Sequence, residues 1–217
     1  MLTVDSDAPA SKRLTFIGTD NYKAGQTGAQ LAIKQLRGKG NVVVYSMPEQ
    51  SNLKDRMRGY HDVFEAHPGV KIVDTVDIKG DPRIAFDHTQ EMVDKKTVDK
   101  IDGFICLEAI ACPEVADVLD RNKVGPKVVV AMDTDQRTLD WIKKGRIAGT
   151  IAQKPFTMGF VGTLTLDTVY HHPPNPLDKL WAQDPQSPVP TFIDTGALLV
   201  DQSNVDSFIS VTAQKGQ

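Results

Sequence analysis

Four polar side chains lie at or near the ends of predicted strands: Arg56, Glu108, Asp133 and Gln153. An open parallel sheet binds its ligands at the carboxyl ends of its strands and at the first turns of the helices that follow. Carboxylates accept hydrogen bonds from hydroxyl groups, and an arginine donates through a planar fork. These residue types, with no nucleophile or general base among them, favour recognition of a molecule with many hydroxyl groups over catalysis.

Two of these residues also have simpler interpretations. Asp133 follows the apolar run "VVVAM" and could cap the next helix. Arg56 could be a solvated helix residue that pairs with Asp55 or Asp62. The binding interpretation is favoured because four strand ends each bring a hydrogen-bonding side chain to the same edge.

Sequence patterns of the common enzyme classes are missing. The chain has no G-x-G-x-x-G after its first strand, no phosphate-binding G-x-x-x-x-G-K-[ST] and no G-x-S-x-G elbow. His171 and His172 are adjacent, so their side chains point apart, and no partner cluster accompanies them. Cys106 and Cys112 are too few for a disulfide framework or a four-ligand zinc site, and Cys106 is expected to be buried. We therefore expect no catalysis, no metal and no cofactor.

The composition of the chain limits the classes of partner that it could bind. The formal net charge is -3 and no block of lysines and arginines occurs, which argues against nucleic acid. No apolar run approaches the roughly 20 residues of a membrane-spanning helix, so no membrane insertion is expected. The sequence as given carries no signal-peptide pattern.

The chain alternates between predicted strands and helices, which favours the α/β class. Continuous apolar runs recur every roughly 20 to 30 residues, the spacing of βα units. Helices are predicted between them: one with Ser51 or Asn52 as its cap, one with Pro113 in its first position, one ending at "LDWIKKG", and one from Pro155 to about His172. This pattern predicts a parallel sheet with helices on both faces. A proline-rich segment then leads to "FIDTGALLVDQSN", which is predicted to form one last strand.

Several segments resemble one family. They are "TVDSD", "FIGTDNYKAGQTGAQLAIKQL", "DRMRGYHDVF", "VVVAMDTDQRTLDWIKKGRIAGTIAQKPFTMG" and "FIDTGALLVDQSNVDSF". The chain resembles the ribose-type periplasmic sugar-binding proteins, which share their fold with the effector domains of LacI-type repressors. The resemblance implies two Rossmann-like α/β lobes that close on a sugar.

The resemblance also implies how the chain is divided. Residues 1–19 would hold the last strands of the N-terminal lobe and the hinge, and residues 20–153 would form the C-terminal lobe. Residues 154–190 would return to the N-terminal lobe as a helix and a proline-rich loop, and residues 191–217 would form the final crossover strand and tail. We therefore expect a shortened family member with a partial second lobe.

Ligand-binding residues are implied by the same resemblance. Asp5 matches a hinge-side aspartate of the family, Arg56 an arginine of the helix after the first C-lobe strand, Asp133 a strand-end aspartate, and Gln153 a crossover glutamine. Glu108 stands where the ribose binders have asparagine, and Ser6 replaces a common sugar-contacting arginine. Because a carboxylate only accepts hydrogen bonds, ribose is not assumed to be the ligand.

The leading hypothesis is therefore a sugar- or polyol-binding protein of transport or chemosensing, in the periplasm or cell envelope, with an ABC transporter permease as a partner. The alternative is the effector domain of a LacI-type regulator without its DNA-binding headpiece. We further expect self-association through the helix 155–172, whose apolar face needs cover.

Overall fold

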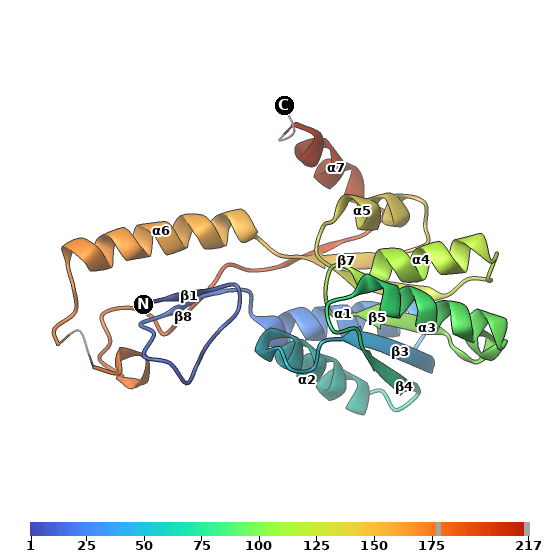
Figure 1. The fold of residues 1–217 in the computed structure, drawn as a ribbon, viewed down its shortest axis with the longest axis horizontal. Helices are drawn as coiled ribbons and strands as arrows, with labels where there is room; N and C mark the ends of the chain where they lie inside the picture. Colours follow the sequence, from blue (N-terminus) through green and yellow to red (C-terminus); the bar gives the residue numbers. More distant parts are fainter. Residues whose placement is uncertain (177–178, 215–217) are drawn as a thin grey trace. The chain divides into compact units, whose positions relative to one another are not determined.

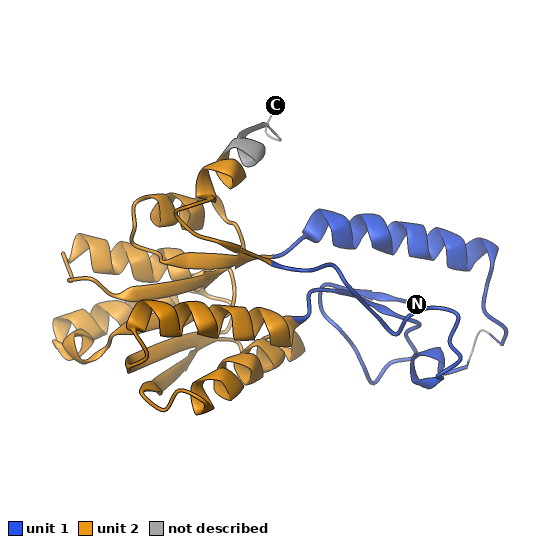
Figure 2. Ribbon diagram, turned by 180° about the vertical axis from the view of Figure 1, so that it is seen from behind, with its two compact units in different colours: residues 1–20, 153–197 blue, residues 21–152, 198–217 orange. Residues whose placement is uncertain are grey.

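The computed structural model describes residues 1–176 and 179–214, which divide into two compact units. Unit 1 comprises residues 1–20 and 153–197, and unit 2 comprises residues 21–152 together with the chain from residue 198 onward (Figure 2). The segment 191–217, predicted as one piece, is thus shared between the two units.

Unit 2 is built on a six-stranded sheet that is parallel except at one edge (Figure 1). The antiparallel strand is β9, which pairs with β7. In spatial order the strands are β4 (Val70–Asp77), β3 (Gly40–Ser46), β5 (Gly103–Cys106), β6 (Val128–Met132), β7 (Gly149–Ala152) and β9 (Leu198–Val200). The apolar runs of the sequence thus form the predicted parallel sheet.

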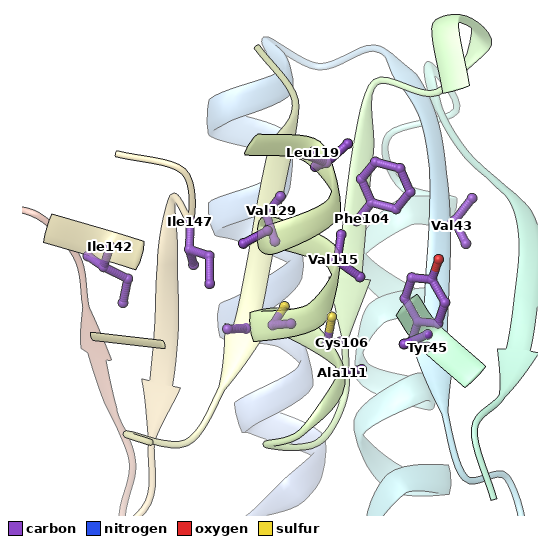
Figure 3. Close-up of a cluster of buried hydrophobic side chains, with 14 of the residues drawn as sticks. Val43, Tyr45, Phe104, Cys106, Ala111, Val115, Leu119, Val129, Ile142 and Ile147 are labelled. Carbon is purple, nitrogen blue, oxygen red and sulfur yellow. The ribbon is translucent and has the colours of Figure 1, made fainter. Parts of the chain in front are cut away.

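Helices cover both faces of this sheet, as predicted. Val42 and Val44 of β3 pack with one buried cluster, and Val43 and Tyr45 pack with the other. The first cluster draws on α1 (Asn21–Leu36) and α2 (Ser51–Glu65), and the second on α3 (Pro82–Asp94), α4 (Ala111–Arg121) and α5 (Gln136–Lys143). Figure 3 shows the second cluster, including the buried Cys106. Strands that are apolar on both sides are what a sheet covered on both faces requires.

Helices α1 and α2 cross at very short range because glycines lie at the crossing. A Cβ atom on Gly25 would stand 2.1 Å from the carbonyl oxygen of Arg56, and one on Gly59 would stand 2.3 Å from that of Tyr22. Neither helix backbone could come so close with a side chain between them. The crossing fixes the backbone of Arg56 against α1.

Unit 1 has a small parallel sheet of three strands and one long helix. The strands are β1 (Thr3–Val4), β2 (Phe16–Gly18) and β8 (Phe192–Asp194), in that spatial order. The helix is α6 (Pro155–His171), as predicted, and the segment that follows contains a short 3₁₀ turn at Trp181–Gln183. Gly162 of α6 faces the sheet: its Cβ would lie 3.3 Å from Val4.

The predicted last strand is two strands, in different sheets. Gly196 separates β8 from β9 with a φ of +76°, and its backbone N–H donates to Asp194 Oδ1 at 2.8 Å. The aspartate turn breaks the strand because it takes the backbone out of the extended conformation. After β9 the chain forms α7 (Val205–Gln214), a helix that the sequence analysis did not anticipate.

Two predicted helix starts were also wrong. Ser51 and Asn52 lie inside α2, whose cap position is Gln50 and carries no side-chain cap bond. Pro113 is the third residue of α4 rather than the first.

Among the described residues, no helix is both long and apolar enough to cross a membrane.

Candidate functional site

Arg56 is a buried arginine at the carboxyl end of the unit 2 sheet. It lies in α2, the helix that follows β3, and only 3% of the residue is exposed. Its Nε donates to Asn21 Oδ1 at 2.9 Å, and one terminal nitrogen donates to the carbonyl oxygen of Leu107 at 2.6 Å. These bonds hold the guanidinium in a fixed orientation next to the end of β5. The interpretation of Arg56 as a solvated helix residue is therefore wrong.

Glu108 follows β5 and binds the start of α4 with both carboxylate oxygens. Oε2 accepts from the backbone N–H of Ile110 at 2.6 Å, and Oε1 accepts from that of Ala111 at 3.1 Å. The first backbone N–H groups of a helix have no partner within the helix, and a carboxylate satisfies them well. Glu108 therefore acts as the cap of α4.

Asp133 follows β6 and has an unusual backbone conformation. Its φ is +67°, in the left-handed region. Two hydrogen bonds to β7 hold it there: its N–H donates to the Ile151 carbonyl at 2.9 Å, and its carbonyl accepts from Thr150 Oγ1 at 2.7 Å. Asp133 does not cap the next helix, because Asp135 does so by accepting from the backbone N–H of Arg137 at 3.0 Å.

Arg56 and Asp133 both act electrostatically on the Glu108 carboxyl, so these three residues form one group. Burial raises the pKa of the Glu108 carboxyl above its usual range. The backbone N–H groups of Ile110 and Ala111 oppose the rise in this pKa; the Asp133 charge adds to it, and the Arg56 charge lowers it. The three residues follow β3, β5 and β6, which are neighbours in the sheet.

Two supporting residues were missed by the sequence analysis. Asn21, the first residue of α1, is buried and orients Arg56. Thr150 of β7 is fully buried and holds the backbone of Asp133. Asn21 lies at a strand-to-helix junction, and this position could have identified it as a site residue from the sequence. Nothing in the sequence distinguished Thr150.

Asp5 and Gln153 belong to unit 1. Asp5 is exposed, follows β1 and has a φ of +66°. Its N–H donates to the Ile17 carbonyl of β2 at 3.0 Å, which repeats the arrangement of Asp133 with Ile151. Gln153 is half-buried and follows β7 directly. Each unit thus has a strand-end aspartate in the left-handed conformation, held by the next parallel strand.

A family model described as a periplasmic binding protein domain matches residues 1–170, and so covers most of the chain. The chain belongs to the periplasmic binding protein family. Members of this family bind solutes without converting them, so the protein is not an enzyme.

The relatives of this periplasmic binding protein bind sugars. The ribose import binding protein of Bacillus subtilis is 25% identical over 190 residues, which are 79% of this chain and 55% of the relative. An arabinose-binding protein from Geobacillus stearothermophilus has a TM-score of 0.80 and 30% identity, over 95% of this chain and 69% of that one. A sugar-binding protein of a sugar ABC transporter from Bacillus halodurans has a TM-score of 0.83 and 29% identity, over 95% of this chain and 70% of that one. The chain spans about half the length of the sequence relatives it matches.

Proposed function

We propose that this protein binds a sugar or a related polyol for transport, with Asp133 and Arg56 as the main ligand-binding residues of unit 2. The observation that carries the proposal is that a strand-end aspartate and a buried, doubly hydrogen-bonded arginine both lie close enough to Glu108 for their charges to act on it. A carboxylate offers about four acceptor positions and suits adjacent hydroxyl groups. Hydrogen bonds within the protein hold the Arg56 guanidinium and the Asp133 backbone before a ligand arrives, so little ordering of these two residues is needed on binding.

Asp5 and Gln153 are proposed as further contributors from unit 1. Their support is the resemblance of the surrounding segments to the family and, for Asp5, the backbone conformation shared with Asp133. Glu108 is proposed to act on the ligand through its charge, since both of its oxygens already accept backbone N–H groups. Its position next to Asp133 and Arg56 favours neutral sugars over acidic ones, because two carboxylates outweigh one guanidinium.

Pentoses are the first ligands to test, since relatives named above bind ribose and arabinose. The relative from an ABC transporter favours transport over the LacI-type regulator. In this proposal the partner is the permease of such a transporter, and the site of action is the periplasm or the cell envelope.

The test is titration calorimetry of the protein with pentoses, hexoses, sugar alcohols and inositols, followed by the same titrations with Asp133→Asn. Asparagine tolerates the left-handed conformation, so this change removes the charge and spares the backbone. For the sugar that binds, we expect the affinity to fall about 10- to 100-fold, the effect of a lost hydrogen bond to a charged group.

Asp135→Asn is the matched control. It changes an aspartate two residues away, and asparagine caps helices as well as aspartate does. Its sugar affinity should equal that of the unchanged protein. Equal affinity of the Asp133→Asn variant, or no binding by a protein that melts cooperatively, would contradict the proposal.

A further inference from the structure

One edge of the unit 2 sheet is strongly basic. The chain runs back along the sheet in each helix, so the segments that lead from α1, α2, α3, α4 and α5 into the next strand lie at the amino ends of the parallel strands, and antiparallel β9 ends at the same edge. These segments are residues 37–39, 66–69, 95–102, 122–127, 144–148 and 201–204. They carry nine lysines and arginines against three aspartates. We call these nine cations the basic edge.

The opposite edge of the same sheet has the opposite charge. The segments that follow β3, β4, β5 and β6 are residues 47–50, 78–81, 107–110 and 133–135. They carry five carboxylates, Glu108 and Asp133 among them, and one lysine. Since the formal net charge of the chain is -3, the basic edge is a local feature of unit 2 and does not follow from the composition.

Three cations of the basic edge occupy positions that favour glycine. Arg37, Lys96 and Lys123 follow α1, α3 and α4 with φ values of +55°, +57° and +53°, in the left-handed region. Glycine is the usual residue there because a side chain strains this conformation, and the corresponding residue after α5 is Gly145, with a φ of +76°. The helix dipole stabilises an exposed cation by less than this conformation costs. The three charges therefore make the fold less stable than glycines would, which indicates a role outside the fold.

Most charges of the basic edge are free to meet a partner. Arg146 pairs with Asp120, and Lys95 pairs with Glu91. The other seven cations make no ion pair with any described residue. Asp102, one of the three aspartates at this edge, accepts a backbone N–H at 2.7 Å through its carboxylate. The basic edge therefore keeps a large excess of unpaired positive charge.

A hollow of about 290 Å³ lies in the basic edge. Lys127, Lys144 and Arg146 line it, and no carboxylate does. Lys127 Nζ donates one hydrogen bond to the Ile101 carbonyl oxygen at 2.5 Å and keeps two further N–H donors. Three cations around one hollow suit an anionic group such as a phosphate.

The residue types of the basic edge favour a lipid surface over a protein as the partner. Seven of the nine cations are lysines, and none of the exposed large apolar side chains of the described residues lies in these segments. Protein interfaces are depleted in lysine and depend on buried aromatic and apolar anchors. An anionic membrane surface attracts a spread of lysines and arginines through charge alone.

We propose that the basic edge holds unit 2 against an anionic membrane surface through lipid phosphate groups, without insertion into the bilayer. This role goes beyond sugar binding, although it uses the proposed location in the cell envelope. Asp133 and Glu108 follow strands at the opposite edge of the sheet, so contact with the membrane leaves that edge uncovered.

Co-sedimentation with lipid vesicles tests the proposal. Vesicles of phosphatidylcholine with an equal share of phosphatidylglycerol should bind the protein at about 50 mM salt and release it at about 500 mM, because salt screens exposed charges. Vesicles of phosphatidylcholine alone should not bind it. Absence of binding to the anionic vesicles, or binding that neither salt nor lipid charge affects, would overturn the proposal. So would tighter binding to a random DNA duplex than to the anionic vesicles.

Glycine substitutions remove charge from the basic edge without straining the fold. The triple variant Arg37→Gly, Lys96→Gly and Lys123→Gly should bind the anionic vesicles about 100-fold more weakly, since each cation near such a surface contributes about fivefold. Lys79→Gly is the matched control: Lys79 is exposed and has a φ of +52°, but it lies at the opposite edge of the sheet. Its affinity for the vesicles should equal that of the unchanged protein.

Thermal unfolding shows whether the triple variant is folded, and glycine at these three positions is expected to keep it at least as stable as the unchanged protein. A folded triple variant that binds the vesicles as tightly as the unchanged protein would refute the role of the basic edge. No sugar is present in these measurements, so their failure would leave the proposed sugar binding untouched.

Discussion

At the scale of the residue, neighbouring carboxylates do different work because of where their backbones place them. Asp133 and Asp135 are two residues apart, yet their roles differ. Asp135 caps α5, whereas the backbone of Asp133 is held in the left-handed region at the carboxyl end of β6. Glu108 caps α4 and is also electrostatically coupled to Asp133. Residue type alone does not separate a helix-capping carboxylate from one proposed to bind the ligand.

Arg56→Met is expected to destabilise the protein by about 2–4 kcal/mol. The change removes the hydrogen bonds that the buried guanidinium donates to Asn21 Oδ1 and to the Leu107 carbonyl oxygen. Urea denaturation measures the free energy of unfolding. Arg58→Met is the control: Arg58 is exposed and pairs with Asp55 at 3.0 Å, so its loss should cost less than about 1 kcal/mol. Similar losses from both variants would show that the Arg56 bonds add little.

Glu108 should make stability depend on pH in an unusual direction. Because burial raises its folded-state pKa above the ordinary 4.5, folding favours the protonated form. The contribution of Glu108 to the free energy of unfolding is complete at pH values below the ordinary pKa of 4.5. It is lost as the pH rises through the raised pKa of the folded state. Denaturation from pH 4 to pH 8 should therefore show the unfolding free energy of the unchanged protein falling relative to that of Glu108→Gln.

Glu65→Gln, at the exposed end of α2, controls for the loss of a carboxylate. It should track the unchanged protein across the range. A difference between Glu108→Gln and the unchanged protein that is constant with pH would contradict the prediction.

At the scale of the element, the crossing of α1 and α2 positions the arginine. The two helices touch through glycines, with backbone atoms of one helix filling the space where a Cβ of the other would be. The polar site therefore depends on residues that carry no chemistry of their own. A change in the packing of α1 against α2 is therefore expected to move Arg56.

Gly25→Ala should destabilise the protein by about 3 kcal/mol and weaken sugar binding as well. The new methyl group would lie 2.1 Å from the Arg56 carbonyl oxygen, so α2 must move. Thermal unfolding and calorimetric titration would measure the two effects. Gly125→Ala, where nothing lies within 4 Å, should change the unfolding free energy by less than about 0.5 kcal/mol. A Gly25→Ala variant as stable as Gly125→Ala would rule out a tight crossing.

At the scale of the whole molecule, the two units differ in how much core they bury. Unit 2 has a sheet covered on both faces by two large apolar clusters. In the described part of unit 1 the buried apolar side chains are Leu14, Phe16, Ile17, Met158 and Trp181. A unit with so small a core should open more readily than its neighbour.

Hydrogen exchange followed by mass spectrometry should therefore separate the units. Peptides from β3, β5 and β6 are expected to exchange slowest, through global unfolding. Peptides from β1, β2 and β8 should exchange faster, by at least about tenfold, through local opening of unit 1. Equal protection of β2 and β5 would mean that the two units unfold together.

Local sequence patterns were enough to predict the strands of the parallel sheet, the helix from Pro155 and the polar residues at the strand ends. These follow from local periodicity and from apolar runs, which report burial on one or both faces of an element. The family, too, was recognisable from its motifs.

The hydrogen-bond partners of these polar residues became known from the three-dimensional structure. It showed that Glu108 caps α4, that Asp135 rather than Asp133 caps α5, and that Asn21 orients Arg56. It also divided the last predicted strand between two sheets at Gly196. The physical reason is the same in each case: the partners of a hydrogen-bonding group are set by neighbours in space, and these come from strands and helices far apart in the sequence.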